Sequence, residues 1–404
     1  MGKFFLRFFV IIFILAISII FFLSYIGLET NKFNDLIKSK ANETHQYVKL
    51  EFKKTKIQLN LKELNLVVKL QKPKVLIKNN EIILSKIDLF LPFRSFITSD
   101  FLLEKAQVAF FENNIKDLSK ITGFFLPKII NKQLNKIFKE GNLEGEFFIP
   151  FEPDGSMGKD YGFSGKVIDA SIDLSKGFLI KNLTTEIYLG KEVENGGFAA
   201  TIRKGSLFDL QLADSIINLK LKKDETIIKS LLYTNGEISF SQIKKISSLL
   251  GLNVNSFKDI NGKVDLKTKI NFILGKKFKI KNLSYAMTGD IAHFVIDTEE
   301  KKIIKKYLPE YNSKVVLKNT NIKLFNSESN LITELNGLIK VKDHFDNFIV
   351  KKKYNYSKKS FDINGVLDLT NSKVEVSKLN YNKNYGRQSE LRFEVGFILN
   401  KQYN

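Results

Sequence analysis

The sequence predicts a mainly β protein, in which an N-terminal transmembrane helix is followed by an elongated, curled antiparallel sheet with a U-shaped groove and a few short amphipathic helices. Three observations support this class. An uncharged apolar run stands near the N-terminus, apolar and polar residues alternate from Val48 onward, and a hairpin-sized unit recurs along the chain. Alternation with a period of two is typical of strands that have one apolar and one polar face.

The apolar run lies within residues 1–28, which we expect to be a transmembrane signal anchor. From Phe8 to Leu28 it holds sixteen Phe, Ile, Leu or Val residues and no charge, with Lys3 and Arg7 before it and Glu29 after it. At roughly 0.3 to 0.6 kcal/mol for each residue, these side chains favour insertion by about 5 to 10 kcal/mol. The run is therefore long and apolar enough to span a bilayer.

A cleaved signal peptide is the alternative to a retained anchor. Cleavage requires small residues one and three positions before the cut, and bulky Tyr25 stands two residues before Gly27. Retention is therefore favoured. Because a short basic N-terminus stays in the cytoplasm and large domains translocate regardless of charge, we expect a single-pass protein of the bacterial inner membrane with its bulk in the periplasm.

Strands are predicted for most of the remaining chain. Residues 29–115 are expected to form an N-terminal strand segment, and residues 116–404 are expected to continue the same sheet in helix-plus-hairpin units. The apolar positions that alternate most regularly with polar ones are Ile57, Leu59, Leu61, Leu64, Leu66, Val68 and Leu70, and then Val264, Leu266, Ile270, Phe272 and Leu274. Such alternation predicts antiparallel strands with one face in water.

Helical spacing interrupts this alternation in a few places. A short helix is predicted from Lys32 to Glu43, and longer apolar stripes at helical spacing run from Leu118 to Phe138, from Ile243 to Leu250 and from Ile303 to Leu308. The last three are expected to pack on the sheet or to cap its open end. Amphipathic helices that lie on a membrane surface are the alternative.

An internal repeat is the most informative feature of the chain. The segment Asp259–Leu266 recurs as Asp362–Leu369, and a looser copy runs from Ser164 to Leu183. Each copy contains Asn-Gly or Ser-Gly, which predicts a turn followed by a strand. The repetition favours a stack of hairpins over a globule with one centre.

An apolar face of this length needs a cover. Counting the alternating runs gives roughly 20 strands, which at about 4.8 Å each make a sheet near 100 Å long. Exposed apolar patches beyond a few hundred Å² mark binding or aggregation surfaces. The sheet must therefore close as a sandwich or curl into a trough, and a trough with a Lys-rich rim suits acyl chains inside and phosphate headgroups at its edge.

Further motifs resemble the AsmA-like family, which includes the TamB- and YhdP-related bridge-type lipid transfer proteins of bacteria. The resemblance begins with the anchor and the short helix around Asn34–Ile37, continues through Ile87, Leu89, Leu91 and the strand Leu103–Phe110, and includes Phe125–Pro127 and Gly141–Gly145. It implies a protein that carries phospholipid between the inner and outer membranes along an apolar groove. It implies no catalytic residues.

The net charge and the cysteine and histidine content limit which classes of function we expect. The net charge of +21 favours an anionic partner, although the abundance of Ile, Lys, Asn and Phe, whose codons are AT-rich, offers a compositional explanation. Nucleic acid is not expected, because aromatic residues do not interleave with a basic face. Cysteine is absent, and His45, His293 and His344 are far apart in sequence, so we expect neither an enzyme nor a metal or other cofactor.

These observations favour one function and leave one alternative. We expect an anchored protein that binds phospholipid acyl chains and assists lipid transport or homeostasis between the two membranes, with other envelope proteins as possible partners. The alternative is a non-enzymatic assembly factor in outer-membrane biogenesis. The candidate groove residues are Ile57, Leu59, Leu61, Leu64, Leu66, Val68, Leu70, Ile87, Leu89, Leu91, Val264, Leu266, Ile270, Phe272 and Leu274.

Overall fold

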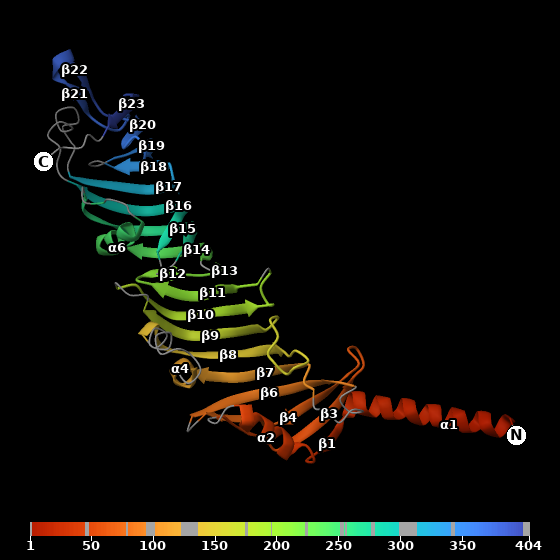
Figure 1. Cartoon of the computed structure of the whole chain (residues 1–404). Helices are drawn as coiled ribbons and strands as arrows, with labels where there is room; N and C mark the ends of the chain where they lie inside the picture. Colours follow the sequence, from red (N-terminus) through yellow and green to blue (C-terminus); the bar gives the residue numbers. More distant parts are fainter. Residues whose placement is uncertain are drawn as a thin grey trace. The chain divides into compact units, whose positions relative to one another are not determined.

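One long antiparallel sheet dominates the computed structural model, which confirms the predicted fold class (Figure 1). Among the residues that the structure describes, 21 strands belong to this sheet. The structure describes residues 2–44, 48–77, 80–93, 102–122, 136–173, 177–194, 196–222, 225–250, 254, 257–275, 279–298, 313–340 and 344–398. The chain consists of two compact units, unit 1 with residues 1–177 and 182–199, and unit 2 with residues 178–181 and 200–404. The boundary expected after residue 115 falls inside unit 1.

Unit 1 begins with a continuous apolar helical segment. It consists of the α-helix α1 (Gly2–Phe21) and one π-helical turn, η1 (Phe22–Ile26). The segment Leu6–Ile26 is long and apolar enough to cross a membrane, and none of it is buried in the protein. A helix that is apolar all round needs an apolar surrounding, as an anchor or a signal sequence would have.

The described rest of unit 1 is an antiparallel sheet with the short helices α2 and α4. The order of neighbouring strands in the sheet is β1, β3, β4, β6, β7, β8, β9 and β10. Strand β5 pairs with the first residues of β6, and β2 pairs with β5. The bounds are β1 (Leu28–Thr30), α2 (Asn34–Thr44), β2 (Val48–Glu51), β3 (Lys54–Asn60), β4 (Asn65–Gln71), β5 (Lys74–Ile77), β6 (Asn80–Pro92), β7 (Lys105–Asn114), α4 (Ile115–Thr122), β8 (Phe138–Pro150), β9 (Gly162–Asp173) and β10 (Leu179–Gly190).

Helix α2 covers part of this sheet. Its residue Ile37 is 5% exposed and belongs to the same buried cluster as Ile57, Val68 and Ile87 of the strands, with Phe33 packed against it. Since each fully buried aliphatic side chain contributes about 1.5 to 3 kcal/mol, this cluster is a conventional core. The face of the unit 1 sheet under α2 is therefore closed by protein.

Unit 2 is a meander in which nearly every strand pairs with the next. Strands β12 and β13 both pair with β14, and the order then runs from β14 to β20 and ends with β23. The bounds are β11 (Phe198–Leu207), β12 (Leu210–Leu212), β13 (Ser215–Leu221), β14 (Thr226–Ile238), α6 (Phe240–Leu250), β15 (Phe257–Leu274), β16 (Ile280–Thr298), β17 (Lys314–Asn326), β18 (Asn330–Lys340), β19 (Phe345–Asn355), β20 (Ser360–Asp368), β21 (Val374–Val376), η3 (Ser377–Leu379), β22 (Tyr381–Lys383) and β23 (Glu390–Ile398).

Most of the predicted helices are present. The helix expected over Lys32–Glu43 is α2, and the one expected over Ile243–Leu250 is α6. Of the helix predicted from Leu118 to Phe138, α4 covers the part up to Thr122, and Lys136 and Ile137 are helical, whereas Phe138 is the first residue of β8. Residues 123–135 and 303–308 lie outside the described residues.

The turn predicted at each Asn-Gly or Ser-Gly of the repeat is wrong. Gly262 lies inside β15, Gly365 inside β20 and Gly165 inside β9. A Cβ atom on Gly262 would lie 2.1 Å from the ring of Phe294 and 2.0 Å from the backbone oxygen of His293. The glycine is required because an aromatic ring from the next strand lies over it, an arrangement known to rescue glycine in sheets.

Irregular positions occur in four successive strands of unit 2, from β14 to β17. Gly236 in β14 (φ +147°) and Gly289 in β16 (φ +157°) adopt backbone conformations that L side chains rarely take, and a Cβ on Gly289 would lie 2.0 Å from the backbone oxygen of Asp265. Between and beyond them, register shifts occur after Lys263 in β15 and after Lys318 in β17. Bulges and glycine kinks bend strands, so the sheet of unit 2 is bent at these positions.

Candidate functional site

One face of the unit 2 sheet carries apolar side chains from β13 to β23. Directly opposed residues of antiparallel strands lie on the same face, so the strand registers define it. We call it the apolar face of unit 2, and its members are Leu219, Leu221, Ile228, Leu232, Val264, Leu266, Ile270, Phe272, Leu274, Met287, Ile291, Ile322, Leu324, Leu331, Leu335, Val350, Ile363, Leu391, Phe393 and Val395. The intervening residues Asp265, Lys267 and Lys269 lie on the opposite face and are exposed.

Helix α6 covers a limited part of the apolar face. Its residues Ile243 and Ile246 pack on a cluster that contains Val264 and Ile291, each 3% exposed. Away from α6 the face opens, and at the last strand Leu391 is 45% exposed. Ordinary packing therefore explains the centre of the face but not its remainder.

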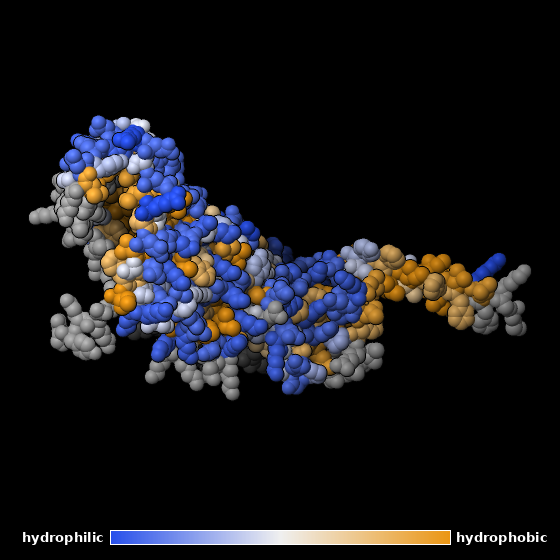
Figure 2. All heavy atoms as spheres, turned by 90° about the horizontal axis from the view of Figure 1, so that it is seen from above, coloured by the Kyte–Doolittle hydropathy of each residue, from blue (hydrophilic) through white to orange (hydrophobic). Residues whose placement is uncertain are grey.

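Figure 2 shows what the open part looks like. At the C-terminal end of unit 2, at the upper left of the view, the surface is hollowed, with apolar residues inside and hydrophilic residues around the opening. The side chains that β15 contributes to the apolar face, such as Ile270 and Phe272, are neither buried nor fully exposed. Partial exposure of this kind fits a concave surface, and the bend across the strands gives its cause.

The predicted groove residues fall into two groups with different surroundings. In unit 2, Val264 is buried beneath α6, while Leu266, Ile270, Phe272 and Leu274 are half-buried on the apolar face. In unit 1, six of the residues are 4–6% exposed in the cluster that includes α2, namely Ile57, Leu66, Val68, Leu70, Ile87 and Leu91. Leu59 and Leu89 pack against that cluster.

Two further groove candidates lie in a turn. Leu61 and Leu64 belong to the connection between β3 and β4 and are 47% and 70% exposed. Leu64 has a positive φ of 51°. In the sequence, two polar residues, Lys62 and Glu63, separate these leucines, and this break in the period of two marks the turn.

A tyrosine pair adds polar groups to the apolar face. Tyr285, opposite Ile270, is 2% exposed, and its hydroxyl has no hydrogen-bond partner among the described residues. Burial, with Tyr356 nearby, raises the pKa of Tyr285 to about 12. Tyr356 by contrast donates its hydroxyl to Oδ1 of Asn326 at 2.6 Å. A buried unpaired hydroxyl is costly, and an ester or phosphate oxygen of a ligand would satisfy it.

One lysine also lies on this face. Lys352 is opposite Thr333 and Ile363, and its Nζ lies 5.3 Å from the centre of the Phe361 ring. Cations over aromatic rings gain about 0.5 to 1 kcal/mol at exposed sites. Neither Tyr285 nor Lys352 was predicted from the sequence, although the run of lysines from 351 to 353 interrupts the alternation there.

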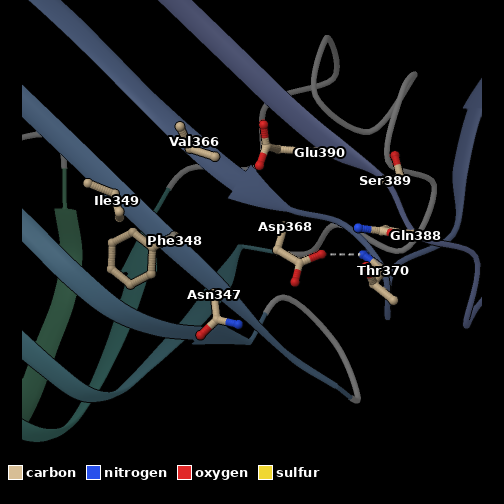
Figure 3. Close-up of a pocket in the computed structure, with 9 residues that line it drawn as sticks. All are labelled: Asn347, Phe348, Ile349, Val366, Asp368, Thr370, Gln388, Ser389 and Glu390. Carbon is tan, nitrogen blue, oxygen red and sulfur yellow. Dashed lines mark hydrogen bonds between the residues drawn. The ribbon is translucent and has the colours of Figure 1, made fainter.

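A cavity of about 250 Å³ lies beside the end of the meander (Figure 3). Its lining comes from β19, β20 and the start of β23, and includes Phe348 and Val366 together with the carboxylates of Asp368 and Glu390. Hydrogen bonds from Thr370, including one from its backbone N–H at 2.9 Å, lower the pKa of Asp368. This carboxylate therefore acts in closing the turn after β20.

The histidines are placed apart from these features. His293 and His344 are exposed, and His344 stacks edge-on with Tyr385, while His45 lies outside the described residues. Within the described part of the chain, no three His, Asp or Glu side chains come together as a metal site would need. No protein-family model matches the chain, and no curated protein or solved structure matches it.

Proposed function

We propose that this chain is a single-pass protein of the bacterial inner membrane, with its bulk in the periplasm, that binds phospholipid acyl chains and assists their movement between the inner and outer membranes. The observation that carries the proposal is the half-buried apolar face of unit 2. It continues over strands β13 to β20 and β23, with one described helix packed on part of it. The resemblance to AsmA-like proteins supports the same function.

The physical argument rests on the state of this surface in water. Apolar surface costs about 25 cal/mol for each Å² exposed, and monomeric proteins rarely leave continuous apolar patches of more than a few hundred Å² uncovered. Acyl chains in the hollow would remove this cost. Exposed lysines at strand ends, such as Lys220 and Lys314, attract the phosphates of lipid headgroups.

Photocrosslinking from neighbouring positions of one strand tests the proposal. A photoreactive residue at Ile270 points to the apolar face, whereas one at Lys269 points to the opposite face of β15. In membranes of living cells, we expect lipid adducts from position 270 and none from position 269. If position 270 forms no adducts with lipid, or if positions 270 and 269 form equal amounts of lipid adduct, the proposal is contradicted.

An assembly role in the envelope is the second candidate, favoured by the last strand. The described residues give β23 one partner strand, β20, and on its apolar side Leu391, Val395 and Phe397 are 45%, 39% and 49% exposed. Such an edge suits the addition of a strand from another protein. A photoreactive residue at Phe397 that forms protein adducts, together with no lipid adduct at Ile270, would favour this role.

A further inference from the structure

A second concave site lies in unit 1, next to the end of the membrane segment. This cavity of about 410 Å³, here called the interface cavity, is lined by Ser24, Tyr25, Gln58, Leu59, Asn60, Leu61, Val67, Lys69, Asp88 and Phe90. Its volume is within the range of small-molecule sites. Apart from Leu59, which also packs against the buried cluster under α2, its lining residues belong neither to that cluster nor to the apolar face of unit 2.

Two elements form the interface cavity. Ser24 and Tyr25 come from η1, and the outer faces of β3, β4 and β6 supply the opposite wall, where Lys69 lies directly across from Asp88. The end of the membrane segment is attached to this wall, since Nε2 of Gln58 donates to the backbone oxygen of Tyr25 at 3.4 Å. Gly27 allows the close approach, because a Cβ there would lie 2.8 Å from the backbone oxygen of Ile57.

The length of the membrane segment fixes the depth of the cavity in a bilayer. The 21 residues from Leu6 to Ile26 extend about 31 Å at 1.5 Å for each residue, which equals the thickness of the hydrocarbon core, about 30 Å. Ser24 and Tyr25 therefore reach the headgroup region on the side of the sheet. Tyrosine is enriched at this depth, so the interface cavity opens where headgroups lie.

The polar groups of the cavity are incompletely satisfied by the protein. Oγ of Ser24 is shielded from solvent and has no hydrogen-bond partner among the described residues. Asp88 is 7% exposed, and its ion pair is with Lys86 at 3.7 Å, a lysine that also binds Glu146 at 2.9 Å. Burial raises the pKa of the Asp88 carboxyl, an effect that Lys86 and Lys69 oppose.

Charges of both signs thus stand side by side in a half-apolar cavity. Lys69 makes no ion pair within the described part of the chain, and it offers an ammonium beside the free hydroxyl of Ser24. Asp88 offers a carboxylate, and Tyr25, Leu61 and Phe90 offer apolar surface. A zwitterion with a phosphate and an ammonium a few bonds apart complements this arrangement.

We propose that the interface cavity binds the headgroup of an aminophospholipid, with the phosphate at Lys69 and Ser24 and the ammonium at Asp88. The proposal rests on the proposed function and adds to it an entry point that selects lipid by its headgroup. Because charge-assisted hydrogen bonds are about twice as strong as neutral ones, Asp88 discriminates between lipids with an ammonium and those with a neutral glycerol headgroup.

The test uses the full chain in nanodiscs made of equal parts of phosphatidylethanolamine and phosphatidylglycerol. A photoreactive residue replaces Leu61, which lines the cavity and is 47% exposed, and mass spectrometry identifies the headgroup of each lipid adduct. We expect the ethanolamine lipid to be enriched about tenfold, the factor expected for one charge-assisted hydrogen bond. Asp88→Asn is expected to return the ratio to that of the bilayer, and Lys69→Ala to lower the adducts of both lipids.

The matched control is another Lys–Asp pair of unit 1. Lys139 and Asp173 form an exposed ion pair at 3.6 Å outside the cavity, so Lys139→Ala and Asp173→Asn are expected to leave the adducts unchanged. Excess soluble phosphoethanolamine is expected to compete poorly, and full competition would assign the site to a free phosphate ester. An intact mass showing that the segment before Gly27 is removed would overturn the proposal.

Failure of this inference is distinguishable from failure of the proposed function. If position 61 captures lipids in the ratio of the bilayer while position 270 still captures lipid, the headgroup site is wrong and the lipid-binding function stands. If position 61 is selective and position 270 captures no lipid, the headgroup site stands and the binding of acyl chains on the apolar face of unit 2 is wrong. Should Asp88→Asn fail to fold, as circular dichroism would show, Lys69→Ala decides, since loss of adducts supports the site and unchanged adducts contradict it.

Discussion

Asp88 carries a charge that the folded protein does not fully stabilise. Because burial raises its pKa, the unfolded chain ionises at a lower pH than the folded one, so the ionised group reduces stability once the pH exceeds the usual value. We expect Asp88→Asn to raise the melting temperature by a few degrees at about pH 7 and to have no effect at about pH 3, where both states are protonated. Circular dichroism of the full chain in detergent measures this. Asp173→Asn is the exposed control, and a lower melting temperature for Asp88→Asn at neutral pH would show that the charge is stabilising.

Two tyrosines of the apolar face allow a comparison at the same scale. Tyr285→Phe removes a buried hydroxyl without a described partner, so we expect it to stabilise the lipid-free protein by about 1 kcal/mol. Tyr356→Phe removes the hydrogen bond to Asn326 and is expected to destabilise by a similar amount. Urea unfolding in detergent gives both values. If a ligand oxygen pairs with Tyr285, then Tyr285→Phe also lowers the lipid retained on purification, and a destabilised Tyr285→Phe would reveal an unseen partner.

At the scale of elements, alternation predicted the strands well, because the period of two needs only local sequence. The three mid-strand glycines of the repeat were wrongly predicted to form turns, and for Gly262 the reason is that the ring of Phe294, which covers it, comes from a neighbouring strand. The same limit applies to the candidate site. The sequence predicted both Ile57 and Ile270 to be groove residues. In the structure, Ile37 of α2 packs in the same buried cluster as Ile57, whereas Ile270 is half-buried. Contacts between distant residues decide which apolar face is core.

The bend in unit 2 gives a prediction about its strands. Gly289→Val puts a side chain 2.0 Å from the backbone oxygen of Asp265 at a φ of +157°, so we expect a loss of about 3 kcal/mol or more. Gly396→Ala in β23 meets only a side-chain oxygen of Asp362 at 3.3 Å and is expected to change stability by less than about 0.5 kcal/mol. Urea unfolding of both variants provides the comparison. Equal stabilities would mean that the strands do not bend at Gly289.

At the scale of the whole molecule, the same chain contains a closed core and an open apolar face. Unit 1 buries its strand residues under α2, as globular proteins do, whereas unit 2 keeps Ile270, Phe272 and Leu324 half-buried along its meander. A meander contacts only neighbouring strands, so its stability comes from pairings along the sheet rather than from a central core. Such a fold can tolerate an unfilled face and gain stability when a ligand fills it.

Filling of the apolar face is therefore expected to be reversible and measurable. Removing lipid with detergent and then the detergent itself is expected to increase binding of a hydrophobic dye, and added phospholipid vesicles are expected to reverse it and raise the melting temperature by mass action. Leu324→Lys places a charge on the apolar face and should lower retained lipid several-fold, because burying a charge among acyl chains is unfavourable. Lys323→Leu changes the adjacent residue on the opposite face and should not. Equal lipid retention by the two variants would mean that the apolar face of unit 2 is not where lipid binds, even if the dye still finds it.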